Sequence, residues 1–275
     1  MSNDPDKRIS RRTVTAVGTG FAVGLLATRG VHASAPEATP EAGAATPAGS
    51  IAPLGYVTMR MRPLDDPQFR DDMNARVIGE FLPKIAAVAG FEGYFVADVI
   101  DHPNLTFGVT VLRDRAAAAR SDAVAKSFVF EGDIDKHIII EETRQWAGDL
   151  LMLGMPADAT ASPAASPVAE NGAGYYVTAR IHTSLPNTDP RGFVPEAIAG
   201  FLPIIVGLPG FVGYLWFPVE GGFVALSVYD TKESAIESTN AAKVWATEHL
   251  AAYTDGNPEV INATVVYANM PIFGA

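Results

Sequence analysis

Two polar pairs with the same spacing are the first candidates for chemistry in this chain of 275 residues. Tyr56 precedes Arg60 by four residues, and Tyr176 precedes Arg180 by four residues as well. A guanidinium offers five N–H donors and a fixed positive charge, so each pair can anchor an anionic or aromatic ligand. The same groups can instead form hydrogen bonds between two packed sheets, and both interpretations stay open at this point.

His182 is the candidate general base. It follows Arg180 by two residues, whereas Arg62 has the same spacing after Arg60. A neutral imidazole can take a proton from an aromatic substrate, and Arg180 would then hold the anion that forms. The candidate catalytic residues are therefore His182 and Arg180. The candidate ligand-binding residues are Tyr176, Arg180, Trp216, Tyr56 and Arg60.

Composition and motif searches exclude several other kinds of site. The chain has no cysteine, which removes disulfides, thiolate metal sites and a cysteine nucleophile. Histidines 102, 137, 182 and 249 show neither HxH nor HExxH spacing, so we expect no metal site. No P-loop, GxGxxG or GxSxG motif occurs, and we expect no cofactor.

The two polar pairs belong to an internal repeat. Three segments recur at an offset of 120 residues: Tyr-Val-Thr-x-Arg at 56 and 176, Phe-Leu-Pro at 81 and 201, and Gly-Phe-x-Gly-Tyr at 90 and 210. A constant offset means that the spacing between elements is kept, which predicts two copies of one folded unit. We place the copies at 55–156 and 175–275, and we expect linkers at 36–54 and 157–174, which are rich in Ala, Pro and other small or polar residues.

Each copy reads as strand, helix, strand, strand, helix, strand. In the first helix Met73, Val77, Phe81 and Ile85 form one apolar face that recurs in the second copy, while Pro83 and its counterpart at 203 are expected to kink or break that helix. This order predicts an α+β protein with two tandem ferredoxin-like βαββαβ domains. We expect the two domains to pack sheet to sheet as an intramolecular barrel.

Finer details of the two copies also follow from the pattern. The closing strands are predicted at 149–153 and 264–268, and Asp114 and Asp230 are predicted to cap the second helices, which implies an offset of 116 residues there. Alternation in the first strand separates Val57, Met59 and Met61 from Tyr56, Thr58, Arg60 and Arg62. We expect the apolar set to face the helices and the polar set to face the opposite sheet or a pocket mouth.

One stretch of the second copy carries a family resemblance. Residues 209–214 (Pro-Gly-Phe-Val-Gly-Tyr), followed by a hairpin and by 223–230, resemble the antibiotic biosynthesis monooxygenase-like domains of the dimeric α/β-barrel group, and 89–94 keep the same frame in the first copy. The resemblance covers both copies and implies a barrel of two sheets. The group contains cofactor-independent oxygenases of aromatic polyketides, haem-degrading enzymes and members without an assigned activity.

The haem-degrading members use an Asn on the first strand, a Trp and a His on the second helix. Here the first strands contain no Asn, and the nearest match is Trp245 with His249. We therefore favour a small-molecule binding or scaffold protein, with the second copy as the binding one. The alternative is a cofactor-independent monooxygenase acting on an aromatic substrate, and haem binding or degradation ranks below both.

The N-terminus predicts export. Arg11 and Arg12 precede an apolar run over 13–27 that is shorter than the about 20 residues of a membrane span, as in a twin-arginine signal peptide. Cleavage is expected after Ala33 or Ala35, which places the protein in the periplasm or outside the cell; an uncleaved membrane anchor is the alternative. Removing 1–35 leaves 15 basic and 29 acidic residues, a net charge of −14, so we expect no nucleic-acid partner.

Overall fold

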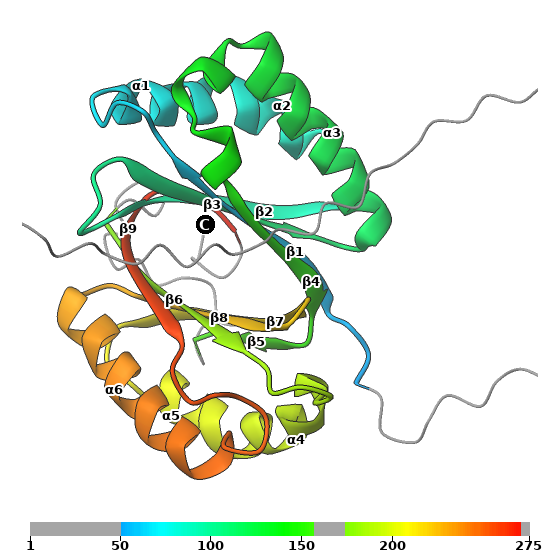
Figure 1. Cartoon of the computed structure of the whole chain (residues 1–275), viewed down its shortest axis with the longest axis vertical. Coiled ribbons are helices and arrows are strands. Elements are labelled where there is room, and N and C mark those ends of the chain that lie inside the picture. Colours follow the sequence, from blue (N-terminus) through cyan, green and yellow to red (C-terminus); the bar gives the residue numbers. More distant parts are fainter. Residues whose placement is uncertain (1–50, 157–173, 271–275) are drawn as a thin grey trace, which may run out of the picture. The chain divides into compact units, whose positions relative to one another are not determined.

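The computed structural model describes residues 51–156 and 174–270, which Figure 1 shows in colour. The predicted signal at Arg11 and Arg12 lies outside these residues, as do nearly all of the two predicted linkers. None of the helices within the two described ranges has the length and apolar character needed to cross a membrane.

Both copies have the predicted order of elements. The first comprises β1 (Gly55–Pro63), α1 (Phe69–Arg76), the π-helical turn η1 (Val77–Phe81), α2 (Leu82–Ala86), β2 (Phe91–Val99), β3 (Leu105–Leu112), α3 (Arg115–Glu131), two 3-10 turns (Ile134–His137 and Ile140–Glu142), β4 (Arg144–Leu150) and β5 (Met152–Gly154). The second comprises β6 (Tyr176–Thr183), the 3-10 turn η6 (Pro190–Phe193), α4 (Val194–Glu196), the π-helical turn η7 (Ala197–Phe201), α5 (Leu202–Val206), β7 (Phe211–Val219), β8 (Gly222–Tyr229), α6 (Lys232–His249) and β9 (Glu259–Asn269).

The strands form one sheet that nearly closes into a barrel. Their order is β4-β1-β3-β2-β9-β6-β8-β7-β5, which contains the ferredoxin-like order once for each copy. Strands β4 and β5 stand at opposite ends of this order but are separated in the chain only by Leu151, whose N–H donates to the carbonyl of Trp216 at 3.1 Å. The predicted intramolecular barrel of two ferredoxin-like domains is therefore confirmed.

The closing strands join the two copies. Strand β9 pairs with β6 of its own copy through 259–264 and with β2 of the first copy through 263–269. Figure 1 shows β9 on one side of the molecule and β4 with β5 on the other, running between the two halves. The predicted strands at 149–153 and 264–268 were too short. The residues that the prediction left out, 144–148 and 259–263, pair with β1 and β6 of their own copies.

The assignment of the sheet faces is corrected by the structure. Val57, Met59 and Met61 lie in the barrel interior, together with apolar residues of β6 to β9, and not against the helices. Arg60 faces helix α3, where it pairs with Asp122. Strands surround most of the barrel interior and supply few polar partners, so the interior takes the apolar set. Helices offer hydroxyl and carboxylate groups to the arginines.

The first helix of each copy keeps its predicted apolar face but is not broken by proline. Phe81 and Phe201 each end a π-helical turn, and Pro83 and Pro203 follow as the second residue of α2 and α5. A π-helical turn is wider than an α-helical one, and we interpret it as the feature that lets the helix pass the proline ring.

The cap of α6 is also corrected. Thr231, not Asp230, accepts the bond from the backbone N–H of Ser234, at 3.2 Å, while Asp114 caps α3 as predicted. The two caps are 117 residues apart, and the strand pairings of Arg60 with Gly108 and Arg180 with Ala225 give the same offset. The first hairpin turn is therefore three residues longer, not four.

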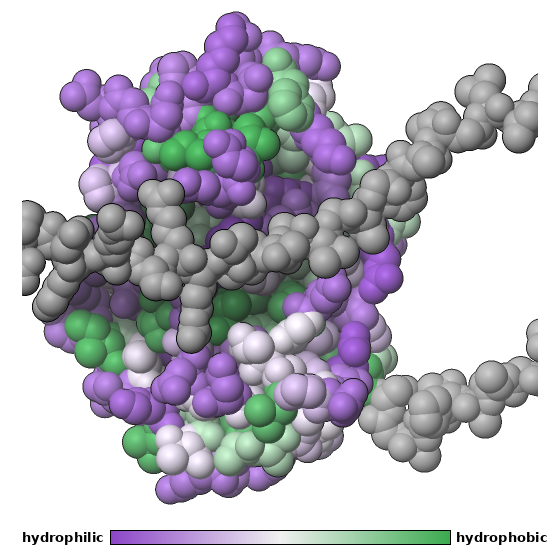
Figure 2. All heavy atoms as spheres, viewed as in Figure 1, coloured by the Kyte–Doolittle hydropathy of each residue, from purple (hydrophilic) through white to green (hydrophobic). Residues whose placement is uncertain are grey.

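One face of the described residues is largely hydrophilic (Figure 2). Hydrophilic residues cover much of the face shown in Figure 2, and apolar residues appear there as separate patches. The apolar side chains with the largest exposed fractions, Val244 and Phe130, come from different repeats.

Candidate functional site

A small cavity lies in the second repeat, between the sheet and helices α4 to α6. Its volume is about 30 Å³. Aromatic side chains provide much of its wall: Phe193, Phe201, Tyr214, Trp216, Phe223 and Trp245. Several are in edge contact, with ring centroids 5.4 Å apart for Phe193 and Trp216 and 5.8 Å apart for Phe201 and Tyr214. The site is thus an aromatic cage on the helix side of the sheet.

Arg180 and His182 also line this cavity. They are two residues apart on β6, so their side chains leave the same face of the sheet. Trp216 comes from β7 and Trp245 from α6. The structure therefore brings together three of the residues selected from the sequence, namely Arg180, His182 and Trp216, although on the opposite side of the sheet from the one expected.

Arg180 is held by hydroxyl groups. Its Nη1 donates to Ser227 Oγ at 2.8 Å, and its Nη2 donates to Ser238 Oγ at 2.8 Å and to Thr239 Oγ1 at 3.1 Å. The residue is 3% exposed, and burial lowers the pKa of its guanidinium. The guanidinium is thereby fixed between the sheet and α6.

Three buried nitrogen atoms of cavity-lining residues have no hydrogen-bond partner among the described residues: Arg180 Nε, His182 Nδ1 and Trp216 Nε1. All three side chains are less than a tenth exposed. Buried polar atoms are almost always paired in native proteins, and leaving one unpaired costs about 1–3 kcal/mol. Their gathering at one cavity makes it the candidate binding site of the second repeat.

His182 is neutral at physiological pH. Its ring stacks on Phe223 with centroids 4.3 Å apart. Burial, followed by the positive charge of Arg180, lowers its pKa to about 4, while Asp255 opposes this effect. A neutral imidazole can donate from one ring nitrogen and accept at the other.

The tyrosines around the site are neutral as well. Burial raises the pKa of Tyr214 far above its ordinary value, and it raises the pKa of Tyr229 to about 12. The hydroxyl of Tyr229 donates to the carbonyl of Ile205 at 3.1 Å, which ties β8 to α5. Neither phenol supplies a negative charge to Arg180.

The outer wall of the cavity is held by contacts between helices. Trp245 stacks against His249 with centroids 4.6 Å apart, and His249 Nδ1 lies 2.6 Å from Glu196 Oε1 on α4. The π-helical turn at 197–201 forms part of the same wall. Such turns are often found at functional sites.

Haem does not fit these residues. The ring of His249, the nearest match to a haem ligand, lies against Trp245 and Glu196 and does not line the cavity. Within the described parts of the chain, no three His, Asp or Glu side chains are grouped so that they could hold a metal ion.

The other candidate ligand residues lie elsewhere. Tyr176 is half-buried and borders a different groove, at the N-terminal end of α6. Tyr56 belongs to the first repeat, where the guanidinium of Arg115 lies 5.5 Å from its ring centre. Arg60 faces α3 in the first repeat. The two repeated Tyr-Arg pairs therefore do not form one site.

The corresponding region of the first repeat is filled differently. Tyr94 packs over Gly108, so that its hydroxyl occupies the space a side chain at Gly108 would need. Arg62 lies where the second repeat has His182, and burial followed by the charge of Arg60 lowers the pKa of Arg62 to about 10. Val96 takes the position of Trp216.

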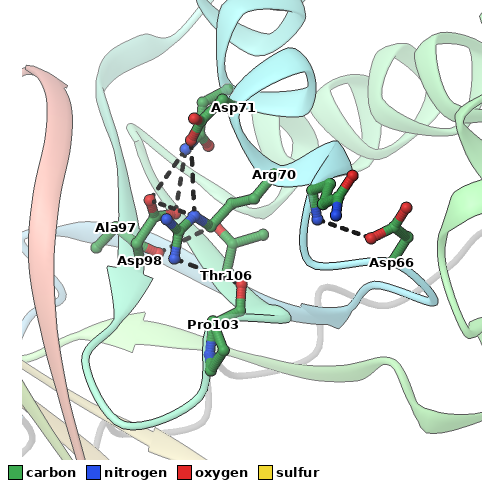
Figure 3. A network of polar contacts seen from close by, with 9 residues as sticks. Asp66, Arg70, Asp71, Ala97, Asp98, Pro103 and Thr106 are labelled. Atoms are coloured by element: carbon green, nitrogen blue, oxygen red, sulfur yellow. Dashed lines mark hydrogen bonds and ion pairs between the residues drawn. The ribbon is translucent and has the colours of Figure 1, made fainter.

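A polar network specific to the first repeat serves as an anchor. Figure 3 shows Asp98, near the end of β2, beside Arg70, whose Nε lies 3.2 Å from Asp98 Oδ2 in an ion pair. Asn74 Nδ2 donates to both carboxylate oxygens of Asp98, at 3.1 and 3.2 Å. Burial raises the pKa of Asp98. The second repeat has Pro218 at this position, so the network ties α1 to the longer hairpin of the first copy.

Comparisons with known proteins identify the fold. The sequence matches no protein-family model and no curated protein. A candidate monooxygenase from Fusobacterium nucleatum superposes with a TM-score of 0.60 at 11% identity, over 79% of this chain and 95% of that one. A second candidate monooxygenase, from Lactobacillus acidophilus, gives 0.57 at 11% identity, over 79% and 97%.

An anthrone oxidase-like protein superposes with a TM-score of 0.53 at 15% identity, over 78% of this chain and 93% of that one. Identities this low establish similarity of fold only. The chain shares the dimeric α/β-barrel fold of these proteins, with both halves of the barrel in one polypeptide.

Proposed function

We propose that the second repeat binds a small aromatic molecule in the cavity between its sheet and helices. The observation that carries this proposal is the gathering of unpartnered Arg180 Nε, His182 Nδ1 and Trp216 Nε1 around one aromatic cage. Aromatic walls with a few convergent polar groups are typical of small-molecule sites. The ring of the ligand would stack in the cage, and an oxygen atom would accept bonds from the nitrogen atoms.

Binding requires the outer wall to move. A cavity of about 30 Å³ has room for roughly two water molecules and not for an aromatic ring. The wall contains the π-helical turn 197–201 and is fastened at the rim by the half-exposed pair of His249 and Glu196. We propose that α4 and α6 separate here to admit the ring.

A filling mutation tests the proposal. Ala242 lines the cavity from α6, and its equivalent in α3 of the first repeat is Ala125, which is buried without lining this cavity. Ala242→Leu should weaken binding of 1-naphthol or 2-naphthoate at least about tenfold in a fluorescence titration. Ala125→Leu should leave binding unchanged. Equal effects of the two substitutions, or tighter binding of haem than of naphthalene probes, would contradict the proposed site.

Cofactor-independent oxygenation is the second candidate. The observation in its favour is that neutral His182 and cationic Arg180 line one aromatic cavity. His182 would take a proton from an activated CH₂ group and Arg180 would hold the anion. Dioxygen would then convert that group to a carbonyl and release one water.

Binding ranks first because the base is weak. A pKa of about 4 makes His182 a poor acceptor for a carbon-bound proton near pH 7, where a general base works best with a pKa near the operating pH. Consumption of oxygen by the protein with an anthrone, lost in His182→Gln, would establish the second candidate over the first.

A further inference from the structure

The equivalent arginines of the two repeats have different partners. Arg60 Nη2 forms an ion pair with Asp122 Oδ1 on α3. Arg180 contacts the hydroxyls of Ser227, Ser238 and Thr239 instead. One buried arginine thus has an internal counter-ion, and the other has only neutral acceptors.

The difference arises from one exchange. With the offset of 117 residues that relates α3 to α6, Asp122 is equivalent to Thr239. The hydroxyls of Thr110 and Ser121, equivalent to those that hold Arg180, are buried without partners in the first repeat. Arg60 therefore pairs with the carboxylate of Asp122. The second repeat has no carboxylate at this position, and Arg180 lies among hydroxyls beside the cavity.

Arg180 is an uncompensated buried charge within the described part of the chain. It is 3% exposed, its hydrogen-bond acceptors are the hydroxyls of serine and threonine, and the nearby Tyr214 and Tyr229 are neutral. A buried cation without a counter-ion is strongly destabilising, and proteins seldom keep one without a use. The Nε–H of Arg180 is buried without a hydrogen-bond partner among the described residues, so the guanidinium keeps one unused donor.

We propose that the ligand of this cavity is an organic anion, an aromatic carboxylate or phenolate, whose charge serves as the counter-ion that Arg180 lacks. This inference rests on the proposed function of the second repeat and names the class of its ligand. In the first repeat Asp122 fills the same role permanently, so that copy needs no ligand charge. The pair Asp122 and Thr239 thus decides which half of the barrel is an anion site.

Two matched probes and three substitutions test this inference. We expect wild type to bind 2-naphthoate at least about tenfold more tightly than 2-naphthamide, which has the same ring without the charge. Thr239→Asp should supply an internal counter-ion and lower the affinity for naphthoate at least about tenfold. The ratio of the naphthoate affinity to the naphthamide affinity should therefore be smaller in this variant than in wild type. Asp122→Thr, in the other repeat, should leave both affinities unchanged.

Thermal unfolding of the free protein provides a readout that needs no ligand. Thr239→Asp should raise the Tm by about 3 °C or more because it pairs Arg180, whereas Thr239→Asn, of the same size but neutral, should not. Asp122→Thr should lower the Tm. Equal affinities for the two probes, or a Tm no higher in Thr239→Asp than in Thr239→Asn, would overturn the inference. Failure of both probes to bind would instead count against the proposed function. The comparison of Tm between Thr239→Asp and Thr239→Asn would still show whether Arg180 lacks a counter-ion.

Discussion

The carbonyl oxygen of Pro218 occupies the space in which a side chain at Gly148 would begin. Gly148 lies on β4 of the first repeat and Pro218 on β7 of the second, so this contact belongs to the seam that closes the barrel. Two backbones approach here more closely than any residue with a Cβ atom allows.

Gly148→Ala should therefore destabilise the protein. The new methyl group meets a backbone atom, which cannot rotate away, and overpacking of this kind costs about 1–3 kcal/mol. We expect a fall in the free energy of unfolding at the upper end of that range, measured by urea denaturation.

Gly79→Ala is the matched control. Gly79 is exposed in the π-helical turn of the first repeat and has no atom within 4 Å of the new methyl group. It should be neutral or stabilise the helix by roughly 0.5–1 kcal/mol. If both alanine substitutions had the same effect, the contact across the seam would not limit barrel closure.

A second contact between the repeats is electrostatic. Arg144 donates to both carboxylate oxygens of Glu259, at 2.6 Å each, and its guanidinium lies 4.5 Å from the ring centre of Trp146. Both ionic side chains are about two-fifths exposed, at 40% and 44%, so solvent screens the pair.

Glu259→Gln should cost no more than about 1 kcal/mol, and the loss should shrink in 1 M salt. The substitution is placed at Glu259 because changing Arg144 would also remove its contact with Trp146. A larger loss of unfolding free energy that does not depend on salt would contradict a solvent-screened pair.

Much of the fold was predictable because its signals are local or repeated. The helix face of Met73, Val77 and Phe81, the hairpins and the order of elements all follow from periodicity within one copy, and the second copy confirms the spacing. The packing of the two copies into one barrel was also predicted, from the repeat and the family resemblance. The lengths of β4 and β9 were not. The residues left out, 144–148 and 259–263, pair with β1 and β6 of their own repeats, but their sequences, Arg-Gln-Trp-Ala-Gly and Glu-Val-Ile-Asn-Ala, show no regular apolar alternation.

The faces of β1 and β6 could not be assigned from alternation. In this fold both faces of the sheet are covered, one by helices and one by the opposite sheet, so the pattern separates two sets without naming their neighbours. The polarity of Arg60 and Arg180 suggested that their face was not the helix-covered one. Both are in fact buried under helices that carry their hydrogen-bond partners.

The exchange of Asp122 for Thr239 was hidden by an alignment error of one residue. Equating Asp114 with Asp230 gave an offset of 116, and the strand register shows 117. With the correct offset the sequence shows that the second helix of one copy carries an acid, Asp122, where that of the other carries a hydroxyl residue, Thr239. Only the structure shows that this position faces the repeated arginine.

Export remains a prediction from the sequence. Arg11 and Arg12 lie outside the described residues, and the expected signal depends on the pair. Replacing both with lysine should retain the full-length precursor in the cytoplasm, detected by cell fractionation, whereas replacing Lys7 and Arg8 should allow export. Export of the double-lysine variant would reject the twin-arginine interpretation.

The pH dependence of stability should report on His182. Its pKa is lowered to about 4 from the ordinary 6.5, so the unfolded chain takes up a proton before the folded protein does as the pH falls. The stability contributed by this group is present above pH 6.5, is lost progressively as the pH falls toward 4, and is gone below it. Protonation in the folded state would place a second cation beside Arg180 in a buried cavity.

We expect wild type to lose about 2 kcal/mol more than His182→Gln between pH 7 and pH 5, from urea denaturation at each pH. Parallel curves for the two proteins would refute a buried neutral imidazole, as would an NMR titration of the His182 ring near its ordinary pKa. Binding of 2-naphthoate should reduce the difference, because an anion beside Arg180 favours the imidazolium and so raises the pKa of His182. If the pKa of His182 stayed the same with naphthoate bound, the imidazole would not interact with the ligand charge. Arg180 would then be the group that interacts with it.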